Sequence, residues 1–326
     1  SEYMFGNLSI MKGARIAVET CMNVKPDETV LVVTDTERVK IAEAFAYASA
    51  SLGAKTIISI MKPMKHHREE PPKPIKEAMK ASDVVLMPTT KSLSHTDARR
   101  EATKQGARIA SMPEITEDMM SIGGLTADYK DIANRTRKIA GILEKGKSVE
   151  IITPSGTRLT MNIEGRTPDQ DMGLYHEPGD WGNLPAGEAC LAPVEGTTQG
   201  TLVIDSMGQT VKQPLIITVK NGWAQRFQGP DAAQLESLLK SADKNAYNIG
   251  EFGIGTNPNA RLIGVVLEDE KVLGTVHVAF GDNTSYVGGH NKSKIHEDGI
   301  LLQPTVKIDG RLIMKDGRLL LNYSVG

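Results

Sequence analysis

The chain of 326 residues is 40% hydrophobic and 24% charged, which is enough apolar material for two domains with cores of their own. Its formal charge of -2 and its 4% content of aromatic residues give no reason to expect nucleic acid or an anionic membrane as a partner. No apolar run reaches about 18 residues, and no basic segment followed by an apolar one opens the chain, so we expect a cytoplasmic protein.

The first part of the chain alternates helix and strand. Helical spacing of apolar residues occurs at 10–21, 37–51, 75–81 and 97–105, and continuous apolar runs at 29–33, 54–60, 84–87 and 107–111 indicate buried strands. Apolar strands separated by helices of this length predict a doubly wound parallel sheet. No G-x-G-x-x-G motif follows any of these strands, so residues 1–146 are predicted to form a Rossmann-like α/β domain without a dinucleotide site.

Ser94, His95 and Thr96 stand out in this domain because they follow the third predicted strand and begin a helix. Ligands of doubly wound sheets bind beyond the carboxyl ends of the strands. Ser94 or Thr96 is expected to cap the helix. His95 is either a plain loop residue or a group that meets the substrate, since a histidine at a helix N-terminus favours its neutral form and can donate or accept a hydrogen bond.

The periodicity changes after a helix predicted at 115–143. Alternation of period two with tight turns predicts short strands at 149–153, 157–163, 201–206, 213–220, 261–267, 275–280 and 305–320, with turn signals at Asp309-Gly310 and Asp316-Gly317. One helix is predicted at 232–242. We therefore place the domain boundary near Gly146 and predict a mostly antiparallel α+β domain for residues 147–326.

Candidate metal ligands are concentrated between Gly274 and Gly299. This stretch contains His277, Asp282, His290, His296, Glu297 and Asp298, and imidazoles and carboxylates are the usual ligands of zinc, cobalt, manganese and iron. His296 and Asp298 are two residues apart, so on an extended segment they point to the same side. His277 lies on a predicted strand, opposite its apolar face. Asp282 and Glu297 have the composition of an ordinary polar turn.

Two further carboxylates enter apolar segments that contain glycine. Glu188 follows Gly187 and precedes an apolar run, and Glu251 lies in the sequence G-E-F-G-I-G. A buried carboxylate is costly unless it is paired or binds a metal. Cys190 is either a buried structural thiol or part of the lining of the site. With Cys21 it makes only two cysteines, too few for a disulfide framework or a thiolate zinc site.

Four motifs occur in order between about residues 180 and 300: N-L-P-x-G-E, G-E-F-G-I-G-x-N-P, G-T-x-H-x-A-x-G and H-x-D. In this order they resemble the aminopeptidase T family of metal-dependent leucyl aminopeptidases. The resemblance implies a two-metal centre held by Glu188, Glu251, His277, His296 and Asp298. That family also places a tyrosine shortly after the motif histidine. The nearest tyrosine here, Tyr286, is offset in spacing, and we assign it no role.

Two ions held by five ligands serve hydrolysis most naturally. One ion polarises the scissile carbonyl, the other activates a water molecule, and a spare carboxylate accepts the proton. We therefore predict a metallo-aminopeptidase or related amidohydrolase that uses two ions of zinc, cobalt or manganese, with Glu188 as a catalytic carboxylate. Its substrate would be a short peptide or another small molecule.

A second enzyme class stays open. His277, His296 and Asp298 form a two-histidine, one-carboxylate set, which holds non-haem iron(II) with open positions for oxygen and substrate. Short chains resembling the aminopeptidase T family include ring-cleaving dioxygenases of dihydroxypyridines, and the shortness of this chain favours that alternative, with one iron and with His95 acting on the substrate. Retention of both Glu188 and Glu251 favours the hydrolase. A third alternative is a metal-stabilised binding protein without catalysis. The resemblance also implies a homo-oligomer, and we expect a homodimer.

Overall fold

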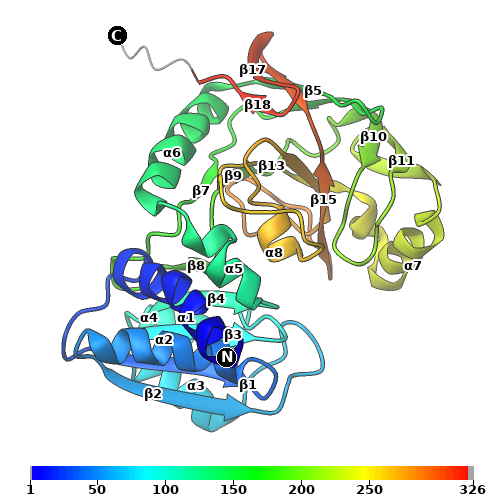
Figure 1. Cartoon of the computed structure of the whole chain (residues 1–326). Coiled ribbons are helices and arrows are strands. Elements are labelled where there is room, and N and C mark those ends of the chain that lie inside the picture. The colour runs from blue at the N-terminus through cyan, green and yellow to red at the C-terminus, as the bar shows by residue number, and fades with distance from the viewer. Residues whose placement is uncertain (1, 322–326) are drawn as a thin grey trace. The chain divides into compact units, whose positions relative to one another are not determined.

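The computed structural model describes residues 2–321, with side chains from Leu8 onward (Figure 1). The chain forms two compact units. The first contains the chain up to Ala133 together with Asp171–Ala186 and Asn259–Arg261, and the second contains Asn134–Gln170, Gly187–Pro258 and the chain from Leu262 on. Gly146, the predicted boundary, follows helix α6 (Tyr129–Lys145), whereas the units divide within this helix, after Ala133.

The first unit is built on a parallel sheet with the strand order β2-β1-β3-β4-β8. Its strands are β1 (Thr29–Asp35), β2 (Lys55–Met61), β3 (Val84–Thr89), β4 (Arg108–Pro113) and β8 (Trp181–Asn183). Strands β1 and β3 are buried along almost their whole length, as central strands covered on both faces must be, whereas the edge strand β2 is largely exposed. The predicted doubly wound parallel sheet is confirmed.

The helical segments of the first unit are α1 (Glu2–Arg15), the π-helical turn Ile16–Cys21, α2 (Val39–Ser51), α3 (Lys73–Lys80), α4 (Asp97–Lys104), α5 (Glu117–Ser121) and the 3-10 turn Gly124–Thr126. Helix α1 packs on α2, and α3 packs on α4. The single helix predicted at 115–143 is wrong. Gly123 and Gly124 interrupt it, because glycine is a poor helix former, and α5 is separated from α6 by the 3-10 turn.

The second unit contains two largely antiparallel sheets. The larger, of order β12-β11-β10-β6-β5-β16-β17-β18, comprises β5 (Ser148–Ile152), β6 (Arg158–Asn162), β10 (Gln199–Ile204), β11 (Leu215–Lys220), β12 (Trp223–Gln228), β16 (Thr305–Ile308), β17 (Arg311–Lys315) and β18 (Arg318–Leu319). The smaller, of order β15-β14-β13-β9-β7, comprises β7 (Asp169–Asp171), β9 (Glu188–Leu191), β13 (Ile249–Gly255), β14 (Val276–Gly281) and β15 (His296–Leu301). The predicted antiparallel α+β domain is confirmed.

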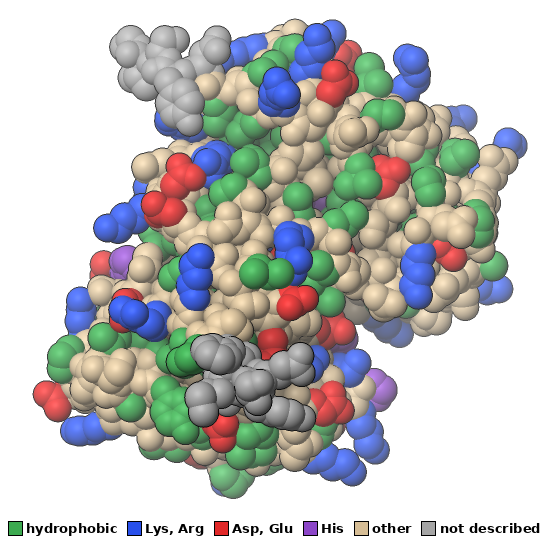
Figure 2. Space-filling view, in the orientation of Figure 1, with side chains coloured by type: hydrophobic (Ala, Val, Ile, Leu, Met, Phe, Trp, Pro, Cys, Tyr) green, Lys and Arg blue, Asp and Glu red, His purple; other side chains and the backbone are tan. Residues whose placement is uncertain are grey.

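Three short helical segments accompany these sheets: α7 (Ala232–Ala242), the 3-10 turn Lys244–Tyr247 and α8 (Val266–Asp269). Helix α7 has the predicted bounds. The strand predicted at 261–267 is wrong, because α8 begins there instead. Among residues 2–321, none of the helices is both long and apolar enough to cross a membrane. On the face shown in Figure 2, Lys and Arg side chains are interspersed with Asp and Glu, in keeping with the small net charge.

The smaller sheet of the second unit has one apolar face. Alternate residues of its inner strands enter the hydrophobic core of this unit: Ala189, Leu191, Phe252, Ile254, Val276, Val278 and Phe280. Because side chains alternate along a strand, the residues between them lie on the opposite face. We call this opposite face of β15, β14, β13 and β9 the site face.

Candidate metal centre

The site face carries all five residues predicted as metal ligands. They are Glu188 of β9, Glu251 of β13, His277 of β14, and His296 and Asp298 of β15. In the strand register, Ala279 lies opposite both Glu251 and Asp298, and Gly253 lies opposite both His277 and Cys190. Antiparallel pairing therefore brings together side chains that are far apart in the sequence, on the side of His277 that was predicted.

Glu251 lies between the two histidines. Its Oε1 atom is 3.1 Å from Nε2 of His277, and its Oε2 atom is 2.8 Å from Nε2 of His296. Nε2 of His296 is also 3.3 Å from Oδ1 of Asp298. On the other side, Nε2 of His277 is 2.9 Å from Oε2 of Glu188. The five side chains thus form one continuous series of contacts.

Two glycines make this arrangement sterically possible. A Cβ atom on Gly253 would be 2.0 Å from Nε2 of His277, so the imidazole ring lies directly over glycine backbone. Gly187 has a φ of +129°, and a Cβ atom there would be 2.8 Å from Cβ of Asn257. The chain therefore enters β9 at Glu188 through a conformation that only glycine adopts easily.

Two hydrogen bonds orient the residues around Glu251 and His296. The backbone carbonyl of Asp282 is 2.7 Å from Nδ1 of His296. Since a carbonyl oxygen only accepts, Nδ1 carries a proton, and Nε2 is the nitrogen turned toward the centre. The hydroxyl of Tyr286 donates to Oε2 of Glu251 at 2.7 Å. Tyr286 thus takes part in the centre although its spacing gave no reason to include it.

The remaining polar candidates lie outside the cluster. Asp282 accepts hydrogen bonds from the backbone N–H groups of Thr284 and Ser293, which makes it a turn residue. His290 approaches Glu195, whose Oε2 is 3.2 Å from its Nδ1. Glu297 alternates with His296 and Asp298 along β15 and so lies on the opposite side of the strand.

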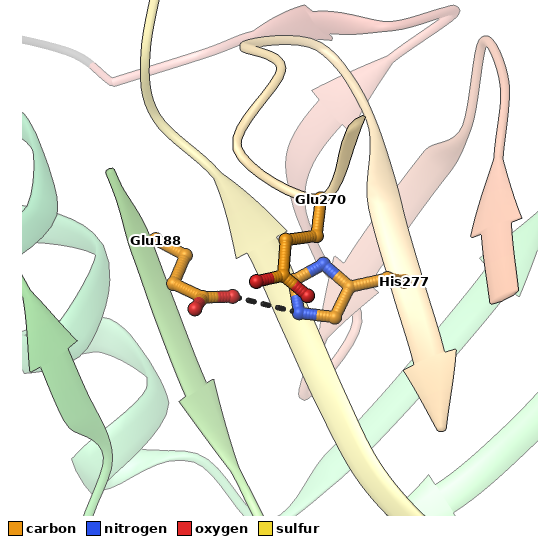
Figure 3. Close-up of side chains that lie close together, drawn as sticks. All are labelled: Glu188, Glu270 and His277. Carbon is orange, nitrogen blue, oxygen red and sulfur yellow. Dashed lines mark ion pairs between the residues drawn. The ribbon is translucent and has the colours of Figure 1, made fainter. Parts of the chain in front are cut away.

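Two adjacent residues that the sequence analysis did not single out complete the cluster. Glu188, Glu270 and His277 each offer a ligand atom within 4.8 Å of the others, and Figure 3 shows both carboxylates directed at the imidazole ring. Lys271 is fully buried, and its Nζ donates to Oε1 of Glu188 at 2.9 Å and to Oε1 of Glu270. The run E-D-E-K at 268–271 has the composition of a solvated surface, yet all four residues are buried. Its position just before the G-T-V-H motif is the signal that could have identified it.

Carboxylates dominate the electrostatics of the centre. Burial alone lowers the pKa values of His277 and His296, but contacts with Glu188, Glu251 and Asp298 outweigh burial and raise both pKa values well above the ordinary one. Burial raises the pKa of Glu251, yet hydrogen bonds from the two histidines hold it well below its usual range. Burial, with the charges of Glu251 and Glu188, raises the pKa of Asp169 in β7 to about 6. The raised pKa values of the two histidines and of Asp169 indicate a site that favours added positive charge.

The cluster fits a divalent cation. Three overlapping groups can hold a metal: Glu188 with Glu270 and His277, Glu188 with Cys190 and Glu251, and Glu251 with His296 and Asp298. Oε2 of Glu188 and Oδ1 of Asp298 are buried and lie close to histidine nitrogens, but neither accepts a hydrogen bond of acceptable geometry. Carboxylate oxygens beside imidazole nitrogens, which give up their proton when a metal ion binds, are the donor set that a transition-metal ion requires. Cys190 is buried on the site face and belongs to one of these groups.

His95 lies in the first unit, between β3 and α4. Its ring meets Trp181 edge-on at 5.8 Å between centroids, and the guanidinium of Arg99 stacks on the same indole at 3.7 Å. Oγ1 of Thr96 accepts a hydrogen bond from the N–H of Arg99, so Thr96 is the N-cap of α4. Ser94 instead donates to Oγ of Ser111. A catalytic role for His95 stays a prediction.

Comparison with known proteins distinguishes between the predicted hydrolase and the alternative dioxygenase. The model of the 2,5-dihydroxypyridine 5,6-dioxygenase family, NicX, matches residues 11–321. A Pseudomonas putida KT2440 protein with the name 2,5-dihydroxypyridine 5,6-dioxygenase is 24% identical over 261 residues, which are 74% of this chain and 71% of that protein. The solved structure of 2,5-dihydroxypyridine dioxygenase from Pseudomonas putida KT2440 has a TM-score of 0.80 at 18% identity, over 96% of this chain and 97% of that one. AmpT from Thermus thermophilus has a TM-score of 0.71 at 17% identity, over 96% and 99%.

These findings overturn the prediction of an aminopeptidase-like hydrolase or protease. The matching family and the Pseudomonas putida sequence are dioxygenases, and the likeness to AmpT shows a shared fold alone. The four motifs contain the five residues predicted as metal ligands. They do not specify the chemistry, because one fold can hold sites of different function.

Proposed function

The chain belongs to the family of 2,5-dihydroxypyridine 5,6-dioxygenases, and from this membership we propose that it opens the ring of a dihydroxylated pyridine with molecular oxygen. The observation that carries the proposal is the family match over residues 11–321, which includes every residue of the metal centre. The Pseudomonas putida relative supports the same reaction class, because its name specifies a dihydroxypyridine as the substrate and the 5,6 bond as the site of attack.

We further propose that the metal is a single iron(II) ion held by Glu251, His296 and Asp298, the group of possible ligands that contains neither of the carboxylates bonded to Lys271. Three protein ligands leave open positions for oxygen and substrate, as a two-histidine, one-carboxylate set does, and a bound iron(II) ion would supply the activation of oxygen. His277 lies beside this group, because Oε1 of Glu251 contacts the imidazole of His277 and Oε2 contacts that of His296. Glu188 is outside this ligand set: its Oε1 accepts a hydrogen bond from Lys271, and its Oε2 lies 2.9 Å from Nε2 of His277.

Tyr286 and His95 have separate proposed roles. Burial and the charge of Glu251 raise the pKa of Tyr286 well above its usual value, so its hydroxyl stays protonated and continues to hold Glu251 in place. His95 is proposed as the group that exchanges a proton with a ring hydroxyl of the substrate, because it follows the carboxyl end of β3, where ligands of parallel sheets bind.

A homodimer is part of the proposal. Tyr47 of α2 and Ile57 and Ile60 of the edge strand β2 are 67%, 52% and 52% exposed, and an exposed edge strand with apolar side chains can pair with another chain. A second copy of the chain would cover it. Sedimentation of the Ile57→Lys, Ile60→Lys double variant should show a monomer at concentrations where the wild type sediments as a dimer, and a wild type that is monomeric at micromolar concentration contradicts this part.

The experiment that tests the enzyme class is oxygen uptake. Protein loaded anaerobically with iron(II) should consume one molecule of oxygen per molecule of 2,5-dihydroxypyridine. When the oxygen supplied is isotopically labelled, both of its atoms should appear in the product. Leucyl amides should stay intact. His95→Ala should keep its iron content and lose about 10²- to 10⁴-fold in turnover, the usual contribution of a general acid or base. Fully loaded protein that takes up no oxygen with any dihydroxypyridine would refute the proposal.

A further inference from the structure

Lys271 is a buried cation inside the metal centre. Its side chain has no solvent exposure, and its Nζ donates to one oxygen of Glu188 and to one oxygen of Glu270. Lysine is almost never fully buried unless it is paired, because the ammonium loses its hydration. Here the pairing partners are two carboxylates that could otherwise hold a metal ion.

The cluster therefore has two halves that differ in their positive charge. The first half is the group Glu188, Glu270 and His277, drawn in Figure 3, and Lys271 is bonded to both of its carboxylates. The second half is the group Glu251, His296 and Asp298, in which the carboxylates contact imidazole nitrogens and the hydroxyl of Tyr286. The first half already contains a cation of the protein itself.

The backbone around Lys271 is held on both sides. Its N–H donates to the carbonyl of Glu268 at 2.9 Å, and its carbonyl accepts from the N–H of Asn257 at 2.9 Å. The N–H of Leu273 donates in turn to the carbonyl of Asn257 at 3.0 Å. A Cβ atom on Gly255, at the end of β13, would be 2.9 Å from the carbonyl carbon of Lys271, so this strand also packs closely against the segment. The segment that carries Lys271 is therefore held in place by its backbone.

We propose that Lys271 takes the place of a second metal ion and limits the centre to one ion. The ammonium satisfies oxygens of Glu188 and Glu270 that a second ion would need, and at such short separation it would repel a divalent cation in the same group. Paired ions are suited to hydrolysis because one can polarise a carbonyl while the other activates water. Lys271 therefore marks a physical difference between a hydrolytic centre and a single-ion centre on one fold. This inference rests on the proposed dioxygenase function for its biological meaning.

The test is the number of ions bound, with zinc(II) as the probe. Metal-free full-length protein is dialysed against zinc(II), and the zinc content is measured by elemental analysis. The wild type should bind one ion per chain. Lys271→Met, which keeps the length of the side chain and removes its charge, should bind two. Lys271→Met combined with Glu270→Gln should return to one, because the first half then loses a carboxylate as well.

Two results would overturn the inference: a wild type that binds two zinc ions of similar affinity, or a folded Lys271→Met variant that binds only one. If the Lys271→Met variant does not fold, the electron paramagnetic resonance spectrum of the wild type loaded with manganese(II) tests the inference instead. An isolated ion supports the inference, and a spin-coupled pair refutes it.

These outcomes are separate from those of the oxygen-uptake assay. A wild type that binds one zinc ion, with a Lys271→Met variant that binds two, supports the role of Lys271 even if no dihydroxypyridine is cleaved. An active dioxygenase that binds a coupled pair of ions refutes the role of Lys271 and leaves the enzyme class standing.

Discussion

The two faces of the sheet β15-β14-β13-β9-β7 are made by alternate residues of the same strands, and they follow different rules. On the core face, large apolar side chains such as Phe252, Val278 and Phe280 pack into the hydrophobic core of the second unit. On the site face, Gly253 and Ala279 stand next to ionisable side chains. Apolar packing is non-directional and tolerates exchange of similar volumes, whereas a ligand set depends on the position of each atom. The side chains on one face of a strand can therefore stabilise the fold, while those on the other face form the metal centre.

The largest expected effect comes from the core face. Phe252→Ala should lower the free energy of unfolding by about 3–5 kcal/mol, because it removes a fully buried ring and leaves a cavity. The protein that remains folded should bind metal with unchanged stoichiometry. Denaturant titration together with elemental analysis checks both statements. A variant that keeps its stability but loses its metal would show that the two faces are not separable.

A ligand on the site face should behave in the opposite way. His296→Ala should weaken metal binding by more than about 100-fold, since loss of a supporting residue alone typically costs 10- to 100-fold. Unfolding of the metal-free protein should change little by comparison. Competition with a chelating dye measures the affinity, and His66→Ala, on an exposed loop, serves as the matched histidine control. Equal affinity in His296→Ala and the control would remove His296 from the ligand set.

Gly253→Ala tests whether the imidazole ring of His277 keeps its place on the site face only because residue 253 has no side chain. The added methyl group would overlap the ring of His277, so we expect metal affinity to fall by about 10- to 100-fold as the imidazole moves away. Gly141→Ala in α6 is the control, because a Cβ atom there meets no other atom within 4 Å, and it should stabilise the helix by up to about 1 kcal/mol. Unchanged affinity in Gly253→Ala would mean that the ring position is not fixed by this glycine.

The smallest expected effect concerns an ion pair that belongs to neither face of this sheet and so serves as a reference for both. In the first unit, Arg108 donates to both carboxylate oxygens of Glu28, at 2.9 and 2.8 Å. Burial opposes the charge of Glu28, but these hydrogen bonds lower its pKa in the folded protein. The pair therefore stabilises the fold at a pH above the unfolded value of about 4.3, and this contribution is lost as the pH falls through the lower folded pKa.

The size of this reference effect should be at most about 1 kcal/mol, because the pair is partly open to solvent. Unfolding of wild type and Glu28→Gln should be compared between pH 7 and pH 3. The difference between them should shrink as the pH falls. A difference that grows toward pH 3 contradicts the assignment.

Periodicity predicted most of the fold because alternation and helical spacing are local. It identified the parallel sheet, helix α7 and the side of β14 on which His277 lies. It failed at 115–143, where two glycines outweigh the apolar pattern, and at the three-residue strand β8, which is too short to have a pattern. Residues of the site were predicted where a motif contained them. Glu270 and Lys271 were missed because a run of charges indicates a solvated surface unless tertiary contacts are known, and Tyr286 was missed because its contact depends on a loop conformation.

The first unit has a consequence for protein synthesis. Its sheet takes its last strand, β8, from a segment that the ribosome delivers only after β5, β6 and β7 of the later sheets. Until then β4 has an open edge, and Trp181 is absent from the apolar cluster against which it packs. A nascent chain that stops at Gly146 therefore presents an unpaired strand edge of the kind that promotes association between chains. Cleavage of the chain near Gly146, where the periodicity changes, therefore separates the parallel sheet of the first unit from its own edge strand, β8.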